Sequence, residues 1–212
     1  MKIGILGSGA VAKTLAAGFL RHGHQVTVGT RDASKLAEWK AANPAAALGS
    51  FVEAASFGEV VVLAVKGGAA LNALNLAGAE NLAGKVVLDT TNPIAEAPPD
   101  GGVLKFFTTL EDSLMERLQR AFPATLFVKA FSSVGNGRMV NPDFGGTRPS
   151  MFLCGNDADA KKTASEILDQ FGWDAEDMGG AEAARAIEPL CILWCIPGLL
   201  RNEWMHAFKV LR

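Results

Sequence analysis

Short apolar runs alternate with longer helix-like segments over the first ninety residues of this chain, and this alternation limits its possible folds more than any other feature. The runs predict β-strands at Lys2–Leu6, Gln25–Gly29, Ala45–Leu48, Glu59–Val65 and Lys85–Asp89. The fourth run is apolar on both faces, as a central strand of a parallel sheet is. Because strands that alternate with helices build a parallel sheet covered on both faces, the pattern predicts an α/β fold of the Rossmann type, with a doubly wound, mostly parallel sheet.

The second half of the chain is less regular, and an insertion rich in proline and glycine follows Asp89. Thr109 is expected to cap a helix at Leu110–Ala121. Further elements are expected as strands at Leu126–Ala130, Ser150–Cys154 and Trp173–Asp177, and as helices at Asp157–Phe171 and Ala181–Phe208, the last kinked or broken at Pro197. No linker separates two folding units, so residues 1–155 are expected to form a Rossmann domain and residues 156–212 a C-terminal strand and helical extension packed on it.

Composition excludes several classes of protein. The chain has 212 residues, of which 49% are hydrophobic and 20% charged, and a formal net charge of −2, which excludes intrinsic disorder and a basic surface for nucleic acid. Three cysteines without a CxxC motif suit neither a disulfide framework nor a zinc site, so no metal is expected and reduced thiols in the cytoplasm are the simplest interpretation. The apolar stretch Pro189–Leu200 is shorter than the roughly 20 residues that a membrane span needs, so no membrane association is expected.

A glycine-rich turn stands between the first predicted strand and the first helix. Its residues Gly7, Ser8, Gly9, Ala10 and Val11, followed by Ala12, form the pattern G-x-G-x-x-A. The first glycine permits a tight turn, the second lets the backbone approach a pyrophosphate, and the small sixth residue lets the helix lie close to the sheet. The N–H groups at that helix terminus face the phosphates. The turn therefore predicts a dinucleotide site, and the alternative is a Rossmann-like domain that has lost its ligand.

The end of the second strand decides which dinucleotide is expected. An NAD site usually places an acidic residue there to hold the ribose 2′-hydroxyl, but here that position is Thr30. Thr30 can donate a hydrogen bond to a 2′-phosphate, Arg31 can pair with it, and Lys35 adds a second positive charge. Asp32 argues against this assignment unless its carboxylate caps the next helix, which we expect. NADP(H) is therefore predicted in preference to NAD(H).

Three further segments lie at carboxyl ends of predicted strands, where ligands of such sheets bind. Val65 and Lys66 follow the fourth strand, and Lys66 is either a phosphate or ribose contact or a solvated loop lysine. Asn92 is either a hydrogen-bond partner of the nicotinamide ribose or carboxamide or a plain turn residue. Lys129, within the sixth strand, is either buried and paired or placed at an edge, and a catalytic role is the less favoured alternative.

The opening KIGILGSGAVAKTLA, the turn Gly29–Asp32 and the segment Val128–Val134 together resemble the family of F420-dependent NADP oxidoreductases and their bacterial dinucleotide-binding relatives. The soluble reductase domain of the membrane-bound ferric reductases is similar too. The resemblance covers about residues 1–155. It implies that Thr30, Arg31 and Lys35 contact the 2′-phosphate, that Gly7–Val11 hold the pyrophosphate and that Ala130 lies beside the nicotinamide. Archaeal members carry a histidine shortly after the position of Ala130, where this chain has Phe131 and Ser132, so the chain departs from the family pattern at the deazaflavin contacts.

These observations predict an enzyme that transfers hydride between NADPH and a flavin-like or deazaflavin acceptor such as F420, which needs orientation and a dry pocket rather than a general acid. The alternatives are an NADPH-dependent reductase of a small carbonyl or imine substrate, or an NADP(H)-sensing module without catalysis. A carbonyl or imine substrate needs a proton donor, and only Lys129, Asn92 and Ser132 are near. The aromatic residues of Glu188–Val210 predict a homodimer interface that also roofs the second-substrate pocket. The sequence identifies neither the acceptor nor the direction of transfer.

Overall fold

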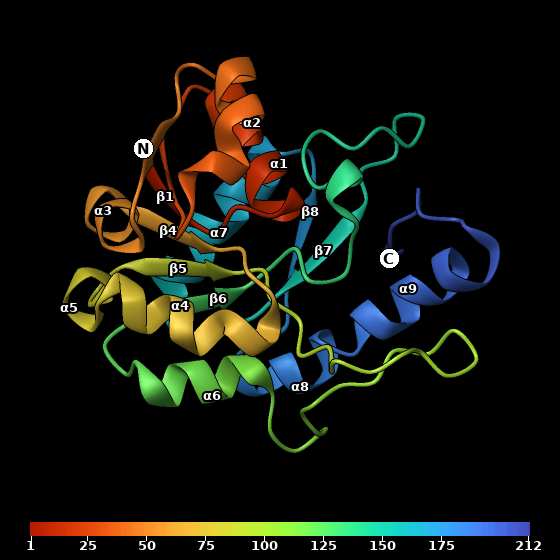
Figure 1. Cartoon of the computed structure of the whole chain (residues 1–212). Helices are drawn as coiled ribbons and strands as arrows, with labels where there is room; N and C mark the ends of the chain where they lie inside the picture. Colours follow the sequence, from red (N-terminus) through yellow and green to blue (C-terminus); the bar gives the residue numbers. More distant parts are fainter.

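The computed structural model describes all 212 residues, and six parallel strands form its main sheet (Figure 1). Their bounds are β1 (Lys2–Leu6), β2 (Gln25–Gly29), β3 (Ala47–Gly49), β4 (Val60–Leu63), β5 (Val86–Asp89) and β6 (Leu126–Lys129). The strand order is β3-β2-β1-β4-β5-β6, so the chain reverses direction across the sheet between β1 and β4. This is the order of the Rossmann fold, and the predicted fold class is confirmed.

Helices cover both faces of the sheet, and each face has its own apolar core (Figure 1). On one face lie α1 (Ala10–Arg21) and α7 (Ala158–Gln170), with the short α2 (Ala37–Ala42) at the side. On the other lie α3 (Phe51–Phe57), α4 (Ala70–Ala77), α5 (Ala79–Leu82) and α6 (Leu114–Ala121). The four residues of β4 are fully covered, as expected of a central strand between two helical layers.

Local capping signals decide where several helices begin. The Asp32 carboxylate accepts a hydrogen bond from the Ser34 N–H, at 3.0 Å, and opens a 3₁₀ turn that leads into α2, as predicted. The prediction for α6 was wrong in its start, because the helix begins at Leu114 and not at Leu110. Its cap is Ser113, which exchanges hydrogen bonds with Glu116 in a capping box, whereas Thr109 lies in the turn before it.

The C-terminal part forms a second, small sheet and a helical segment. β7 (Ser150–Leu153) and β8 (Asp174–Asp177) pair in parallel, and the bridge between Lys129 and Cys154 joins them to the main sheet. They are followed by α8 (Ala184–Ile187) and α9 (Leu190–Arg201). α9 runs away from the sheet, and the yellow-green insertion that contains Gly102 reaches alongside it (Figure 1).

The helix expected at Ala181–Phe208 differs from the structure in two places. Of the kink or break expected at Pro197, the break is absent, because α9 continues to Arg201; proline removes only the hydrogen bond to the carbonyl of Leu193, a residue that is 55% exposed to water. The helix also does not reach Phe208, because Asn202 adopts a left-handed conformation and the chain turns back. The returning tail (residues 203–212) lies beside β7, where the Ser150 N–H donates to the Phe208 carbonyl.

One continuous helical stretch, Ala181–Arg201, is long and apolar enough to cross a membrane by length and composition, with a mean hydropathy of 1.5. One third of its apolar window is buried in the protein, and a core helix passes the same test. Arg185 and Glu188 within this stretch form ion pairs with Glu116 and Lys129. One such helix is weak support for a membrane span, and the absence of membrane association stays a prediction.

Candidate dinucleotide-binding site

The glycine-rich turn joins β1 to α1 in a conformation that only glycine allows at its first position. Gly7 has a φ of +138°, and a Cβ atom there would lie 2.2 Å from the carbonyl oxygen of Ala64. Gly9 faces open space and is the N-cap of α1. No side chain caps this helix and no acidic residue lies in its first turn, so its free N–H groups and the positive end of its dipole are available to an anion.

The next two predicted contacts, Arg31 and Lys35, follow the end of β2. Both side chains are exposed, and neither forms an ion pair within the protein. The nearby carboxylate of Asp32 is occupied by Ser34, because the Ser34 hydroxyl and N–H both donate to it and lower its pKa. Thr30 folds over the same turn, where its hydroxyl exchanges hydrogen bonds with the backbone of Asp32. Two cations without partners thus lie beside an acid that is already bound.

The structure brings the remaining predicted residues to the same edge of the sheet, at the ends of three neighbouring strands. Val65 lies beside Gly7, and Lys66 is exposed after β4. The Cα of Gly67 is so close to the Asn92 carbonyl that a Cβ would come within 2.0 Å of its oxygen. Ala130 is fully buried after β6, and its N–H donates to the Asp89 carbonyl. The ends of β4, β5 and β6 therefore form one continuous surface next to the glycine-rich turn.

Asn92 ties two of these strand ends together. Its Nδ2 donates to the Ser132 carbonyl at 2.8 Å, whereas its Oδ1 and the hydroxyl of Ser132 have no partner in the protein. A buried polar atom without a partner costs about 1–3 kcal/mol, and such atoms are rare in folded proteins. Phe131, between Ala130 and Ser132, has a φ of +59°, which is strained for a bulky residue.

For Lys129 the sequence left two alternatives open, a buried and paired side chain or a place at an edge, and the structure shows the first. Its side chain is fully buried, and its Nζ lies 2.6 Å from Asp89 Oδ2, 3.0 Å from Glu188 Oε1 and 2.9 Å from the Thr91 carbonyl oxygen. Burial acts to lower the pKa of Lys129, but the carboxylates of Asp89 and Glu188 outweigh it and raise that pKa. Three bound acceptors and a raised pKa make the Lys129 ammonium a weak acid, which disfavours it as the proton donor that a carbonyl or imine reductase needs.

The histidines and cysteines occupy structural positions. His22 and His24 bind Asn141 and Gln170 at the amino-terminal pole of the sheet, and His206 stacks on Trp194 with 4.9 Å between ring centres. Burial raises the pKa of Cys154 to about 12, so this thiol is inert at neutral pH. No group of three or more His, Cys, Asp or Glu side chains is arranged to hold a metal ion.

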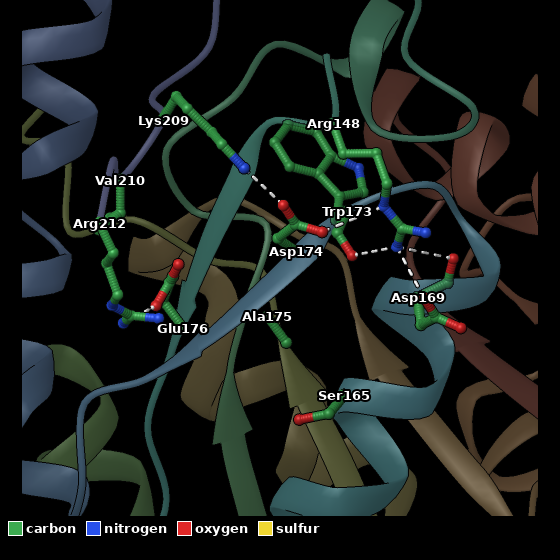
Figure 2. A pocket seen from close by; sticks show the side chains of 10 residues that line it. All are labelled: Arg148, Ser165, Asp169, Trp173, Asp174, Ala175, Glu176, Lys209, Val210 and Arg212. Atoms are coloured by element: carbon green, nitrogen blue, oxygen red, sulfur yellow. Dashed lines mark hydrogen bonds and ion pairs between the residues drawn. The ribbon is translucent and has the colours of Figure 1, made fainter. Parts of the chain in front are cut away.

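One surface hollow lies away from all of these residues. It has a volume of about 470 Å³ and is lined by charged side chains from β8, the end of α7 and the C-terminal tail (Figure 2). Its cations are already paired: Arg148 with Asp169 and Asp174, Lys209 with Asp174, and Arg212 with Glu176. The hollow contains no predicted site residue, and its paired charges hold the tail against β8.

The residues at the strand ends fit a phosphorylated dinucleotide. The glycine-rich turn offers free N–H groups for a pyrophosphate, and Arg31 and Lys35 offer unpaired positive charge for a further phosphate. When bound, a nicotinamide coenzyme supplies hydride chemistry, and the protein supplies binding, orientation and shielding from water. The charged residue Asp89 and the more distant Glu188 were missed by sequence reasoning. No local signal links Glu188 to Lys129.

Comparison with known proteins agrees with this geometry. The family model described as "NADP oxidoreductase coenzyme F420-dependent" matches residues 2–93. A crystal structure from Arthrobacter sp. fb24, described as a "putative f420 dependent nadp-reductase", is 34% identical, covers 100% of both chains and superposes with a TM-score of 0.94. An imine reductase of Streptomyces aurantiacus is 20% identical over 94% of this chain and 63% of its own, with a TM-score of 0.70, and shares the fold.

Among curated proteins, metalloreductase STEAP3 of Rattus norvegicus is 34% identical over 204 residues. The match covers 94% of this chain but only 39% of that protein, so the chain spans well under half of the curated relative. The full-length match to the Arthrobacter structure and the family model together establish the relationship. The resemblance predicted from the sequence is confirmed: the chain belongs to the family of F420-dependent NADP oxidoreductases.

Proposed function

We propose that the protein binds NADP(H) in preference to NAD(H) and transfers hydride between NADPH and a flavin-like or deazaflavin acceptor. The observation that carries the proposal is the pair of exposed, unpaired cations Arg31 and Lys35, beside a carboxylate that is bound to Ser34. A 2′-phosphate gains charge-assisted hydrogen bonds from a guanidinium. The Asp32 carboxylate stays ionised, but Ser34 holds it as a helix cap and the two cations outnumber it. Val65, Lys66, Asn92 and Ala130 then line the path from the pyrophosphate to the nicotinamide.

The choice of acceptor rests on the state of Lys129, which is the only ionisable group among the three candidate proton donors Lys129, Asn92 and Ser132. Direct hydride transfer between two stacked rings requires no proton donor on the protein, and the one lysine near the expected nicotinamide end is buried and bound by three acceptors. The description of the Arthrobacter protein as a "putative f420 dependent nadp-reductase" is in line with a deazaflavin acceptor. The same observation disfavours the small carbonyl or imine substrate that some neighbours of the same fold use.

We further propose that the protein acts as a cytoplasmic homodimer. α9 and the residues after it expose several large apolar side chains, namely Leu193, Leu199, Leu200, Trp204 and Met205. Exposed apolar surface of this kind on one element is typical of an interaction site. Size-exclusion chromatography with light scattering tests the assembly, and a clean monomer at micromolar concentration contradicts it.

The experiment that tests the function is steady-state oxidation of NADPH and NADH with F420, FMN, FAD and a panel of small carbonyls and imines. We expect turnover with a flavin-like acceptor and preference for NADPH. Turnover with carbonyls or imines alone would show that another group donates the proton. Tight NADPH binding without turnover for any acceptor would favour a sensor that acts through a partner.

A further inference from the structure

A buried ion cluster links the C-terminal helical segment to the strand ends. Its members are Lys129 at the end of β6, Asp89 at the end of β5 and Glu188, which lies between α8 and α9. All three side chains are at least 98% buried. Glu188 also accepts hydrogen bonds from the N–H groups of Leu114 and Met115, each at 3.0 Å, so one carboxylate joins the start of α6 to Lys129.

The cluster binds Thr91 through three hydrogen bonds. Lys129 donates to the Thr91 carbonyl, while the N–H and hydroxyl of Thr91 donate to Asp89 Oδ1 at 2.9 and 2.6 Å. Every polar group of Thr91 is therefore bound to a member of the cluster. A change in the position of Lys129 or Asp89 is therefore expected to shift the backbone of Thr91, because these two residues hold all of its hydrogen bonds.

Thr91 in turn orients Asn92. The two residues share a peptide bond, and Asn92 is further limited by Pro93 and by the close contact of its carbonyl with Gly67. The Asn92 side chain then reaches the Ser132 carbonyl, in the loop after β6. α9 packs against that same loop: the Trp194 ring lies so close to Gly135 that a Cβ atom there would come within 2.6 Å of it.

We propose that Glu188 and Lys129 are positioning residues, which transmit the docking of the C-terminal helical segment to the Thr91–Asn92 turn and so set Asn92 toward the nicotinamide end of the cofactor. This inference rests on the proposed function, since it assigns Asn92 to the nicotinamide half of NADP(H). The inference predicts that Glu188, which is far from the glycine-rich turn, affects binding of the nicotinamide half of the cofactor and not of the adenosine half.

The test compares two ligands by calorimetry: NADP⁺, and 2′-phospho-ADP-ribose, which lacks the nicotinamide. For Glu188→Gln, which keeps the size of the side chain and removes its charge, we expect NADP⁺ binding to weaken roughly threefold to thirtyfold, the range of one coupled contact. Binding of 2′-phospho-ADP-ribose should stay within about twofold. The matched control is Glu116→Gln: Glu116 also holds the start of α6 and pairs with Arg185, but does not touch Lys129. It should leave both affinities unchanged.

A double-mutant cycle separates positioning from a general loss of structure. If Glu188 acts through Asn92, then Asn92→Ala and the double variant bind NADP⁺ equally weakly, whereas independent effects multiply. Multiplied effects, or equal weakening of both ligands by Glu188→Gln, would overturn the inference. If the wild-type protein binds neither ligand, the proposed function fails and the inference falls with it; if it binds both and Glu188→Gln changes neither, only the inference fails.

A second variant and a ligand-free readout cover the case in which Glu188→Gln does not fold. Thr91→Val removes only the hydroxyl bond to Asp89 and keeps the shape of the side chain. It should weaken NADP⁺ in the same direction and also speed hydrogen exchange at the Asn92 amide. Unchanged NADP⁺ affinity and unchanged exchange in Thr91→Val would contradict the proposed path.

Discussion

The charged side chains at the two ends of the candidate site differ in whether they have partners within the protein. After β2, Arg31 and Lys35 are exposed and unpaired, and the neighbouring α1 begins without a side-chain cap. At the ends of β5 and β6, Asp89 and Lys129 are buried and bound to each other and to Glu188. Charge that lacks a partner in the fold is available to a ligand, whereas charge that is already paired stabilises the protein. Substitutions at the two ends should therefore separate into losses of affinity and losses of stability.

The largest effect is expected from Lys129→Met. Removal of the ammonium leaves the Asp89 and Glu188 carboxylates buried without their cation, and breaking a buried pair in this way costs about 3–5 kcal/mol. Urea unfolding should show this loss as a lower midpoint with an unchanged slope. Lys66→Met is the control: its side chain is exposed and unpaired, and the free energy of unfolding should change by no more than about 0.5 kcal/mol. Equal losses in the two variants would remove the contrast between the ends.

Arg31→Ala should show the opposite profile. Loss of a charge-assisted bond to the 2′-phosphate is worth about 1.5–3 kcal/mol, so NADPH affinity should fall roughly 10- to 100-fold while NADH affinity and thermal stability stay unchanged. Calorimetry with both coenzymes measures the difference. An unchanged preference for NADPH contradicts the assignment of Arg31. Arg21→Ala is a matched control, since Arg21 is an exposed arginine at the far end of α1.

The ion pair between Glu116 and Arg185 is a second case of charge that is paired within the protein, and it should make stability depend on pH. Hydrogen bonds from the Arg185 guanidinium hold the pKa of Glu116 at about 2, against an ordinary value of 4.5. A carboxyl whose folded pKa is lowered stabilises the protein above its unfolded pKa, and this stability is lost as the pH falls from about 4.5 toward 2. Because the Arg185 side chain is 41% exposed, solvent screening limits the effect to about 1–2 kcal/mol.

Unfolding by urea at a series of pH values measures this contribution. Between pH 5 and pH 2, the free energy of unfolding should fall less in Glu116→Gln than in the wild-type protein, and the difference should be about 1–2 kcal/mol. An identical pH profile in the two proteins would show that the ion pair with Arg185 does not stabilise the folded state.

The smallest effect is expected at the hollow in Figure 2, where paired charges are exposed. Lys209 pairs with Asp174 at the surface, and exposed pairs are worth about 0.2–1 kcal/mol. Lys209→Ala should lower the free energy of unfolding by no more than this, and 1 M salt should abolish the difference. A loss as large as that of Lys129→Met would show that the C-terminal tail contributes far more to stability than its exposed contacts indicate.

Much of the fold was predictable because its signals are local. The periodicity of the first ninety residues gave the strands of the sheet to within one or two residues, and Asp32 was correctly assigned as a cap. The start of α6 was predicted wrongly although its signal was present: Ser113 and Glu116 have the spacing of a capping box, which is more specific than the lone Thr109. The end of α9 was missed because Asn202, in a left-handed conformation, is not distinguished by the apolar pattern around it.

The residues of the candidate site also divide into those with a local sequence signal and those without one. The contacts assigned to the glycine-rich turn and to Thr30, Arg31 and Lys35 follow from short motifs, and they stay predictions until ligands are bound. The surroundings of Lys129 did not follow, because Asp89 and Glu188 reach it from segments far apart in the chain.

Sequence by itself determined the order of strands and helices along the chain, the turn that only glycine can make and the presence of two cations after β2, since each depends on neighbours within a few residues. Only the tertiary structure decided which charges are used within the fold. Burial and the pairing of Lys129 depend on the packing of β5, β6 and the C-terminal helices against one another, and no local pattern encodes these distances.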